Sequence, residues 1–256
     1  MELARFIFIA CLKALALLFL SLLAAKAVGA LRSATTPARR NALVQWGLYG
    51  LILALVTRGA MTVGYDVAAE VYVRAGNRAR EGRDLVRAYM NTRQAVELRP
   101  TNLSYWQALS ATKFALQQYA SGAADAPAIQ ALSGGKLSEL DAYQLGVSYY
   151  LLGEYTQVHP LTQSLIRDNR SYAAPYVLEG YALLAESRWG EATKVFQEVL
   201  RMYPTQQSAV EGLAHAQYLG GNRLVSISVL DQTAKYKFSP EVRQRFEALK
   251  GLYGLE

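Results

Sequence analysis

The side chains that could support catalysis or metal binding are few and lie far apart in the sequence. His159 and His215 are the only histidines, and Cys11 is the only cysteine. Zinc sites draw their ligands from such residues at short spacings, and these three residues form no such pattern. The segment Gly134-Gly135-Lys136 lacks the GxxxxGK(S/T) pattern of a phosphate-binding loop, and no GxSxG motif marks a nucleophilic serine. The sequence therefore predicts a protein without enzymatic activity, cofactor or metal ion.

Positive charge is concentrated near the N-terminus. Of the 256 residues, 52% are apolar and 18% are charged, against about a quarter charged in an ordinary soluble domain. Residues 1–65 contain seven basic side chains and one acidic, whereas residues 66–256 contain 20 basic and 19 acidic, so the net charges are +6 and +1. A nucleic-acid-binding protein would carry its positive excess on the folded domain. This distribution excludes nucleic acid as a partner and favours a lipid bilayer.

Two apolar segments are long enough to cross a bilayer. Residues 6–25 contain Lys13 as their only charged residue, and residues 42–65 form the second segment. At about 1.5 Å per residue, twenty helical residues span the roughly 30 Å of hydrocarbon. The Arg-rich segment 31–41 joins them as a short loop. We therefore predict a two-helix transmembrane hairpin over residues 1–65.

The first apolar segment has a second interpretation as a cleavable signal peptide. In that case Lys13 closes the basic region, residues 14–25 form the apolar core, and Ala25-Lys26-Ala27 is the cleavage site. We favour the anchor. In an anchor, Lys13 lies within the span, where a cation is costly unless it reaches the surface or finds a partner.

Basic residues also predict the orientation. Cytoplasmic loops are enriched in Lys and Arg, and the loop contains three arginines and no acidic residue. The loop is therefore expected in the cytoplasm of a bacterial cell, and the residues after 65 on the periplasmic side of the inner membrane. The residues predicted at the membrane interface are Lys13, Arg32, Arg39 and Arg40.

Four arginines beyond the second span favour the opposite orientation: Arg74, Arg78, Arg80 and Arg83. They belong to a folded domain, and folded domains are translocated largely regardless of charge. We therefore predict a multi-pass membrane protein whose larger domain is periplasmic.

Residues 66–256 contain a repeat of 34 residues. Five units begin at residues 69, 103, 139, 173 and 207, with two extra residues in the second. Position 8 of the units is always small: Gly76, Ser110, Gly146, Gly180 and Ala214. Position 20 is small in four of the five: Ala88, Gly122, Val158, Ala192 and Ser226. Small residues at these positions allow the two helices of a unit to approach closely.

The fourth unit resembles the tetratricopeptide repeat (TPR), a helix–turn–helix unit of 34 residues. Residues of the family's types stand at the family's positions: Tyr176, Gly180, Leu183, Ala192, Phe196, Val199 and Pro204. The resemblance implies an all-α fold in which about five helix–turn–helix units stack into an α-solenoid over residues 66–256. Stacked repeats need a cap, which we predict as a helix over residues 240–254.

Gly180 tests this register. At position 8 of the fourth unit it should lie against the second helix near Ala192, so that leucine in its place would overpack the contact. Alanine is expected to be nearly neutral, because Ala214 occupies the equivalent position of the fifth unit.

The second unit departs from the pattern. Pro127 stands where a regular repeat is in mid-helix, and Asp125 is expected to cap a short, delayed helix. The segment Ser133-Gly134-Gly135 then forms a flexible joint. A decayed repeat and a hinge are both compatible with this sequence.

In TPR proteins the first helices line a concave groove through positions near 2, 5, 9 and 12. The partner-binding residues predicted on this basis are Phe114, Tyr143, Val147, Tyr150, Tyr181, Leu184 and Tyr218. Leu140, Val177 and His215 occupy further positions of this kind. The alternative is that the tyrosines pack between repeats with their hydroxyl groups in water.

Together these features predict a non-enzymatic, membrane-anchored TPR adaptor or scaffold. Its groove would bind a protein or peptide partner during assembly of a membrane or periplasmic complex. Two spans followed by a periplasmic TPR domain are similar in layout to the two-span TPR proteins of cytochrome c maturation. The alternative is a structural accessory subunit, docked into a larger integral membrane complex through its transmembrane helices.

Overall fold

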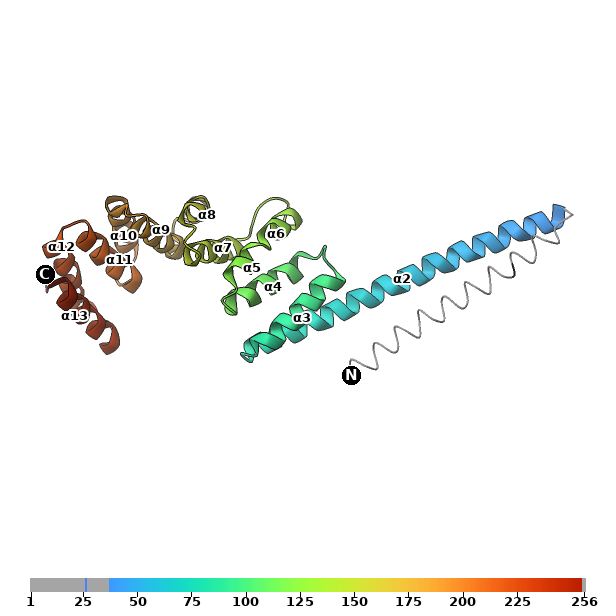
Figure 1. The fold of residues 1–256 in the computed structure, drawn as a ribbon, viewed down its shortest axis with the longest axis horizontal. Helices are drawn as coiled ribbons and strands as arrows, with labels where there is room; N and C mark the ends of the chain where they lie inside the picture. Colours follow the sequence, from blue (N-terminus) through green and yellow to red (C-terminus); the bar gives the residue numbers. More distant parts are fainter. Residues whose placement is uncertain (1–25, 27–36, 255–256) are drawn as a thin grey trace. The chain divides into compact units, whose positions relative to one another are not determined.

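The computed structural model describes Lys26 and residues 37–254, and the described residues form helices joined by turns, without a strand (Figure 1). The predicted first span, residues 6–25, lies outside the described residues, as do Lys13 and Arg32. The chain divides into two compact units, Met1–Val71 and Tyr72–Glu256. The all-α prediction is confirmed for the part of the chain that is described.

The longest helix is α2, Pro37–Glu81, with 45 residues. It includes residues 37–41, which were predicted as part of the loop and are helical. Proline is favourable in the first turn of a helix, where its missing N–H is not needed. Arg39 and Arg40 consequently belong to this first turn. The segment Gln45–Glu81 is long and apolar enough to cross a membrane, and it is the one such helix among the described residues.

The helices after α2 form pairs. The C-terminal part of α2 and α3 make the first repeat, and each later repeat begins with a helix at the residue numbered 1 in the sequence register. The bounds of the helices are α3 Leu85–Leu98, α4 Leu103–Ala115, α5 Tyr119–Ala123, α6 Ala126–Leu132, α7 Glu139–Leu151, α8 Tyr155–Asp168, α9 Ala173–Ala185, α10 Trp189–Met202, α11 Gln207–Leu219, α12 Arg223–Asp231 and α13 Pro240–Gly254. A 3-10 turn, η1 Gln232–Lys235, follows α12.

The turn inside every repeat has the same backbone. The residue at position 15 has a positive φ angle in all five: Arg83 62°, Gln117 60°, Gly153 79°, Ser187 62° and Gly221 81°. The next residue donates its N–H to the carbonyl oxygen five residues back, as from Arg188 to Leu183 at 2.8 Å. This is the Schellman bond that closes a helix with a left-handed residue. Only two of the five residues are glycine, so the sequence alone did not reveal the feature.

The core of the fourth and fifth repeats is built around Phe196, which is fully buried. A Cβ atom added to Gly180 would lie 2.6 Å from Cζ of this ring, and one added to Gly212 would lie 2.3 Å from the same atom. The tip of the ring therefore occupies the space left by two glycines, one on α9 and one on α11. Gly180 does lie at a close contact, but with the ring of Phe196.

The packing of Phe196 therefore argues against the expected neutrality of alanine at position 180. The comparison with Ala214 does not hold, because Ala214 belongs to a different buried cluster, with Val210, Leu230, Phe246 and Tyr253, and not to the cluster of Phe196. The volume available at position 8 depends on the side chain that faces it in each repeat.

The irregular second repeat replaces one helix by two short ones, α5 and α6. Asp125 precedes α6, but its side chain caps nothing. Its carboxylate instead pairs with the Lys113 ammonium at 2.7 Å, and both side chains are buried. The predicted capping role is wrong because a buried cation needs a charged partner more than a helix end needs a cap. The following Gly134 and Gly135 both have positive φ angles.

Gly180→Ala should lower the free energy of unfolding by about 1–3 kcal/mol, because the added methyl group must displace a ring that Gly212 confines on its other side. Denaturant unfolding of the full chain in detergent micelles, followed by helical circular dichroism, measures this. Gly190→Ala is the matched control: a Cβ at Gly190 meets nothing within 4 Å, so that variant should be as stable as the parent or slightly more stable. Equal stability of the two variants would contradict the packing described for Phe196.

Candidate functional site

A groove of about 570 Å³ lies among the first helices of the first three repeats. Its wall is contributed by the C-terminal part of α2, by α4 and by the N-terminal half of α7. The residues that carry polar groups into it include Asn77, Arg80, Ser104, Gln107, Asp141 and Gln144. Most occupy the first helices at or beside positions 2, 5, 9 and 12, so consecutive repeats place side chains along one surface.

Two apolar residues from the predicted set line this groove. Phe114 is half-buried on α4, where its ring packs edge-on against Tyr119 with 5.6 Å between centroids. Leu140 is the second residue of α7 and is 61% exposed. An exposed leucine and the edge of an aromatic ring offer a partner an apolar contact among polar groups.

The polar groups of the groove differ in how far they are satisfied. Asp141 accepts hydrogen bonds from Gln107 Nε2 at 2.7 Å and from the Ser138 hydroxyl at 2.6 Å, both at Oδ2. Asn77 Oδ1, in contrast, is buried and has no hydrogen-bond partner among the described residues. An unsatisfied buried amide is costly, and this one lies beside the groove.

The other predicted residues pack within and between repeats. Tyr143 contacts Tyr172 at 5.9 Å between ring centroids, and Tyr150 contacts Tyr155 at 5.7 Å. Tyr143, Tyr150 and Val147 surround the buried cluster of Val158, Leu178 and Ala182. Burial raises the pKa of both Tyr143 and Tyr150. These three residues come together, but they do not line the groove.

The predicted residues of the later repeats are also engaged. Tyr181 packs edge-on against Phe196, and its hydroxyl donates to the Ser208 carbonyl oxygen of the next repeat at 3.0 Å. Burial raises the pKa of Tyr181 to about 12. Leu184 is buried, and Tyr218 stacks on Tyr253 of α13 at 4.5 Å. In these positions the aromatic rings join one repeat to the next.

The two histidines differ in their surroundings. His215 Nδ1 lies 3.1 Å from the Tyr253 hydroxyl, and burial lowers its pKa. His159 lies between two carboxylates of the neighbouring repeat. The described part of the chain has no group of three His, Cys, Asp or Glu residues arranged to hold a metal ion.

Sequence reasoning did not place the polar residues of the groove among the predicted partner-binding residues. It used the correct helix positions but selected only apolar and aromatic residues at them. Asn77 and Arg80 stand at positions 9 and 12 of the first repeat, and Gln107 at position 5 of the second. A search for polar residues at the same helix positions would have identified Asn77, Arg80 and Gln107.

Comparison with known proteins identifies the fold. No protein-family model and no curated protein matches the sequence. Among solved structures, the crystal structure of MamA has a TM-score of 0.59 at 17% identity, covering 67% of this chain and 97% of MamA. YrrB, described as a TPR protein with an unusual peptide-binding site, has a TM-score of 0.58 at 17% identity, covering 69% of this chain and 90% of YrrB. MamA 41-end from Desulfovibrio magneticus RS-1 has a TM-score of 0.61 at 11% identity, covering 66% and 94%. The predicted TPR solenoid is thereby confirmed as the fold.

Tyr181→Phe should lower the free energy of unfolding by about 0.5–1.5 kcal/mol, because it removes the hydrogen bond to the Ser208 carbonyl oxygen in the next repeat. Tyr143→Phe is the control, because within the described chain its hydroxyl makes no hydrogen bond, and it should be close to neutral. The measurement is again denaturant unfolding of the full chain in micelles. If Tyr181→Phe and Tyr143→Phe have the same free energy of unfolding, the hydroxyl of Tyr181 does not join the two repeats.

Proposed function

We propose that this protein is a membrane-anchored adaptor that binds an extended segment of a partner protein in the groove of its first three repeats. The observation that carries the proposal is the groove itself, which combines the exposed Leu140 and the half-buried Phe114 with the polar side chains of Asn77, Gln107 and Gln144. An extended segment has backbone N–H and C=O groups at regular intervals, and these can pair with amide side chains of the groove. The TPR fold of the chain and of the peptide-binding YrrB supports this proposal.

The proposed partner segment has mixed chemistry. Arg80 and Asp141 give the groove one cationic and one anionic group, and Gln107 and Gln144 supply neutral amides. A small apolar side chain of the partner would pack against Leu140 and Phe114. Specificity in this proposal comes from polar pairing, since the amides, hydroxyls and charged groups of the groove discriminate by hydrogen-bond geometry.

The anchor in this proposal is the apolar part of α2 together with the segment 6–25. Support comes from the exposure of large apolar side chains along α2, among them Leu51, Leu55 and Val63 at 58%, 60% and 62%. Such side chains are costly in water and favourable in hydrocarbon. We place the repeats in the periplasm and the arginines of the hairpin at the cytoplasmic interface. Assembly of a membrane or periplasmic complex is the process in which we propose the adaptor acts.

Leu140→Arg should weaken binding of peptides selected against the full chain from a random library by at least about tenfold, or about 1.4 kcal/mol. The long cation would occupy the groove and remove its apolar contact. Leu224→Arg is the matched control, because Leu224 is 82% exposed on α12 and outside the groove. Isothermal titration in micelles gives the affinities. Absence of any selected binder, or equal loss in both variants, would contradict the groove as the binding site.

Membrane insertion predicts that the full chain resists extraction with sodium carbonate. In a Cys11→Ala background, Thr205→Cys, in an exposed turn of the repeats, should react with a membrane-impermeant maleimide while the inner membrane is intact. Arg39→Cys, at the cytoplasmic side in our proposal, should react only after lysis. Carbonate release would contradict the anchor, and the opposite labelling pattern would contradict the orientation.

A further inference from the structure

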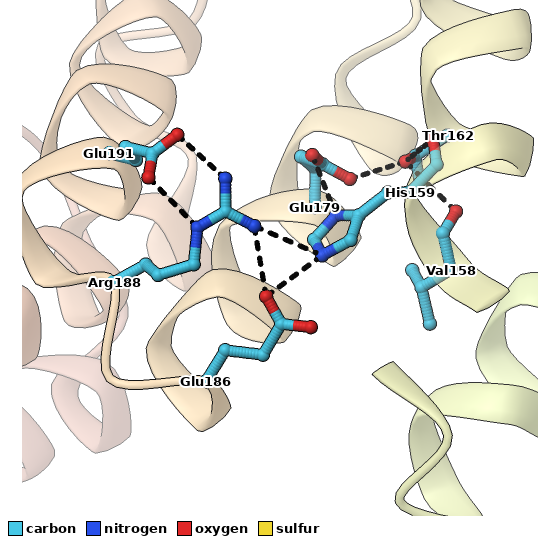
Figure 2. A network of polar contacts seen from close by, with 7 residues as sticks. All are labelled: Val158, His159, Thr162, Glu179, Glu186, Arg188 and Glu191. Atoms are coloured by element: carbon cyan, nitrogen blue, oxygen red, sulfur yellow. Dashed lines mark hydrogen bonds and ion pairs between the residues drawn. The ribbon is translucent and has the colours of Figure 1, made fainter. Parts of the chain in front are cut away.

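The junction between the third and fourth repeats contains a cluster of charged side chains, shown in Figure 2. His159 lies on α8 of the third repeat, and its Nδ1 is 2.9 Å from Glu179 Oε1 on α9 of the fourth. Its Nε2 is 3.0 Å from Glu186 Oε2 at the end of α9. The ring thus lies between two carboxylates, with one at each nitrogen.

Glu179 is the more enclosed of the two carboxylates. It is 7% exposed, and its second oxygen accepts a 2.5 Å hydrogen bond from the Thr162 hydroxyl of α8. Both partners of this carboxylate therefore come from the third repeat. If His159 is neutral, this buried charge is left with neutral partners only.

The two carboxylate contacts at the ring favour one protonation state. An ionised carboxylate only accepts hydrogen bonds, so each ring nitrogen must donate. A neutral imidazole has one N–H and would present a lone pair to the second carboxylate. The imidazolium form satisfies both contacts at once.

Other charged groups complete the cluster. From the turn before α10, Arg188 Nη1 lies 3.0 Å from Glu186 Oε2 and 3.5 Å from His159 Nε2, while its other nitrogens pair with Glu191 of α10. Helix α7 also packs against α8, and the two helices run antiparallel. The acidic residues Glu139 and Asp141 lie in the first turn of α7, whereas His159 lies near the beginning of α8. These two carboxylates are therefore at the opposite end of the helix pair from His159. Within the described cluster, the three carboxylates and two cations sum to −1 with His159 charged and to −2 with it neutral.

The balance of forces on the ring favours the charged form. Burial opposes charging of His159, but the hydrogen bonds and attractions of Glu179 and Glu186 outweigh it and raise its pKa above 6.5. The pKa of Glu186 is lowered: burial opposes this shift, and hydrogen bonds from Arg188 and His159 outweigh the burial. Because the folded-state pKa of His159 is raised, its stabilisation is complete below the unfolded value and is lost as the pH rises through the folded value.

We propose that His159 makes the junction of the third and fourth repeats sensitive to pH, holding α8 against α9 when the ring is protonated and releasing this contact when the ring loses its proton. The proton leaves from Nδ1 or Nε2 to solvent, and no other bond changes. Loss of the proton from the His159 ring affects this one junction, because each repeat of a solenoid contacts mainly its neighbours. The pH therefore alters the coupling between the groove-bearing repeats and the C-terminal repeats.

The direct test is a titration of the full chain in detergent micelles, with histidine labelled with carbon-13 at the ring. The chain has two histidines, so two ring signals are expected, and His215→Gln assigns them. The His159 signal should titrate with a midpoint above 6.5, and that of His215 below it. Glu186→Gln should lower the midpoint of His159. A His159 midpoint at or below that of His215 would overturn the proposal.

The structural consequence is measured by hydrogen–deuterium exchange between about pH 5.5 and 8.5, corrected for the intrinsic exchange rate. Amides of α8 and α9 should lose protection as the pH passes the His159 midpoint, while α11 and α12 should not. The His159→Gln variant should abolish this pH dependence, and His215→Gln should retain it. If His159→Gln fails to fold, the midpoint shift in Glu186→Gln decides. Exchange at α8 and α9 that is independent of pH in the parent chain would refute the proposed release.

Discussion

The spacing between helices is the constraint on which the solenoid depends. At position 8 of the fourth repeat a single Cβ atom decides what fits, because the space beside Gly180 is filled by the ring of Phe196. The same ring also fills the space beside Gly212 of the fifth repeat. One side chain therefore sets the distance both within a repeat and between two repeats. Close packing of this kind explains why glycine is required at both Gly180 and Gly212, although glycine is unfavourable inside helices.

Buried charge is handled by pairing in two separate places. In the second repeat, Lys113 and Asp125 pair where a regular helix is broken into two short ones. At the third junction, Glu179 is paired with a histidine, whose charge depends on pH. Only the second pair depends on whether a histidine is protonated. The chain has few charged residues, yet it places one buried ion pair in its irregular repeat and one between two repeats. At these positions apolar packing alone would specify the geometry poorly.

The sequence was informative where one physical requirement dominates. Small residues at a 34-residue period predicted the repeat fold, because close helix approach leaves little choice of residue. It was less informative where two requirements compete. Asp125 could cap a helix or neutralise Lys113, and Tyr181 could line a groove or bridge to Ser208; in both cases the tertiary contact, which no local pattern encodes, prevails. The polar groove residues were not selected as partner-binding residues because a polar residue on a helix is ordinarily only solvated. Asn77 becomes distinctive through burial alone.

The left-handed turn inside every repeat has an evolutionary consequence. Glycine adopts this backbone freely, yet arginine, glutamine and serine hold it at positions 83, 117 and 187. A non-glycine residue in this conformation is strained by about 1–2 kcal/mol. The surrounding helix pairs must therefore impose the turn, and the turn residue itself is left almost free to vary. Such a chain can lose most of the sequence signature of its repeats by mutational drift while its backbone path is retained.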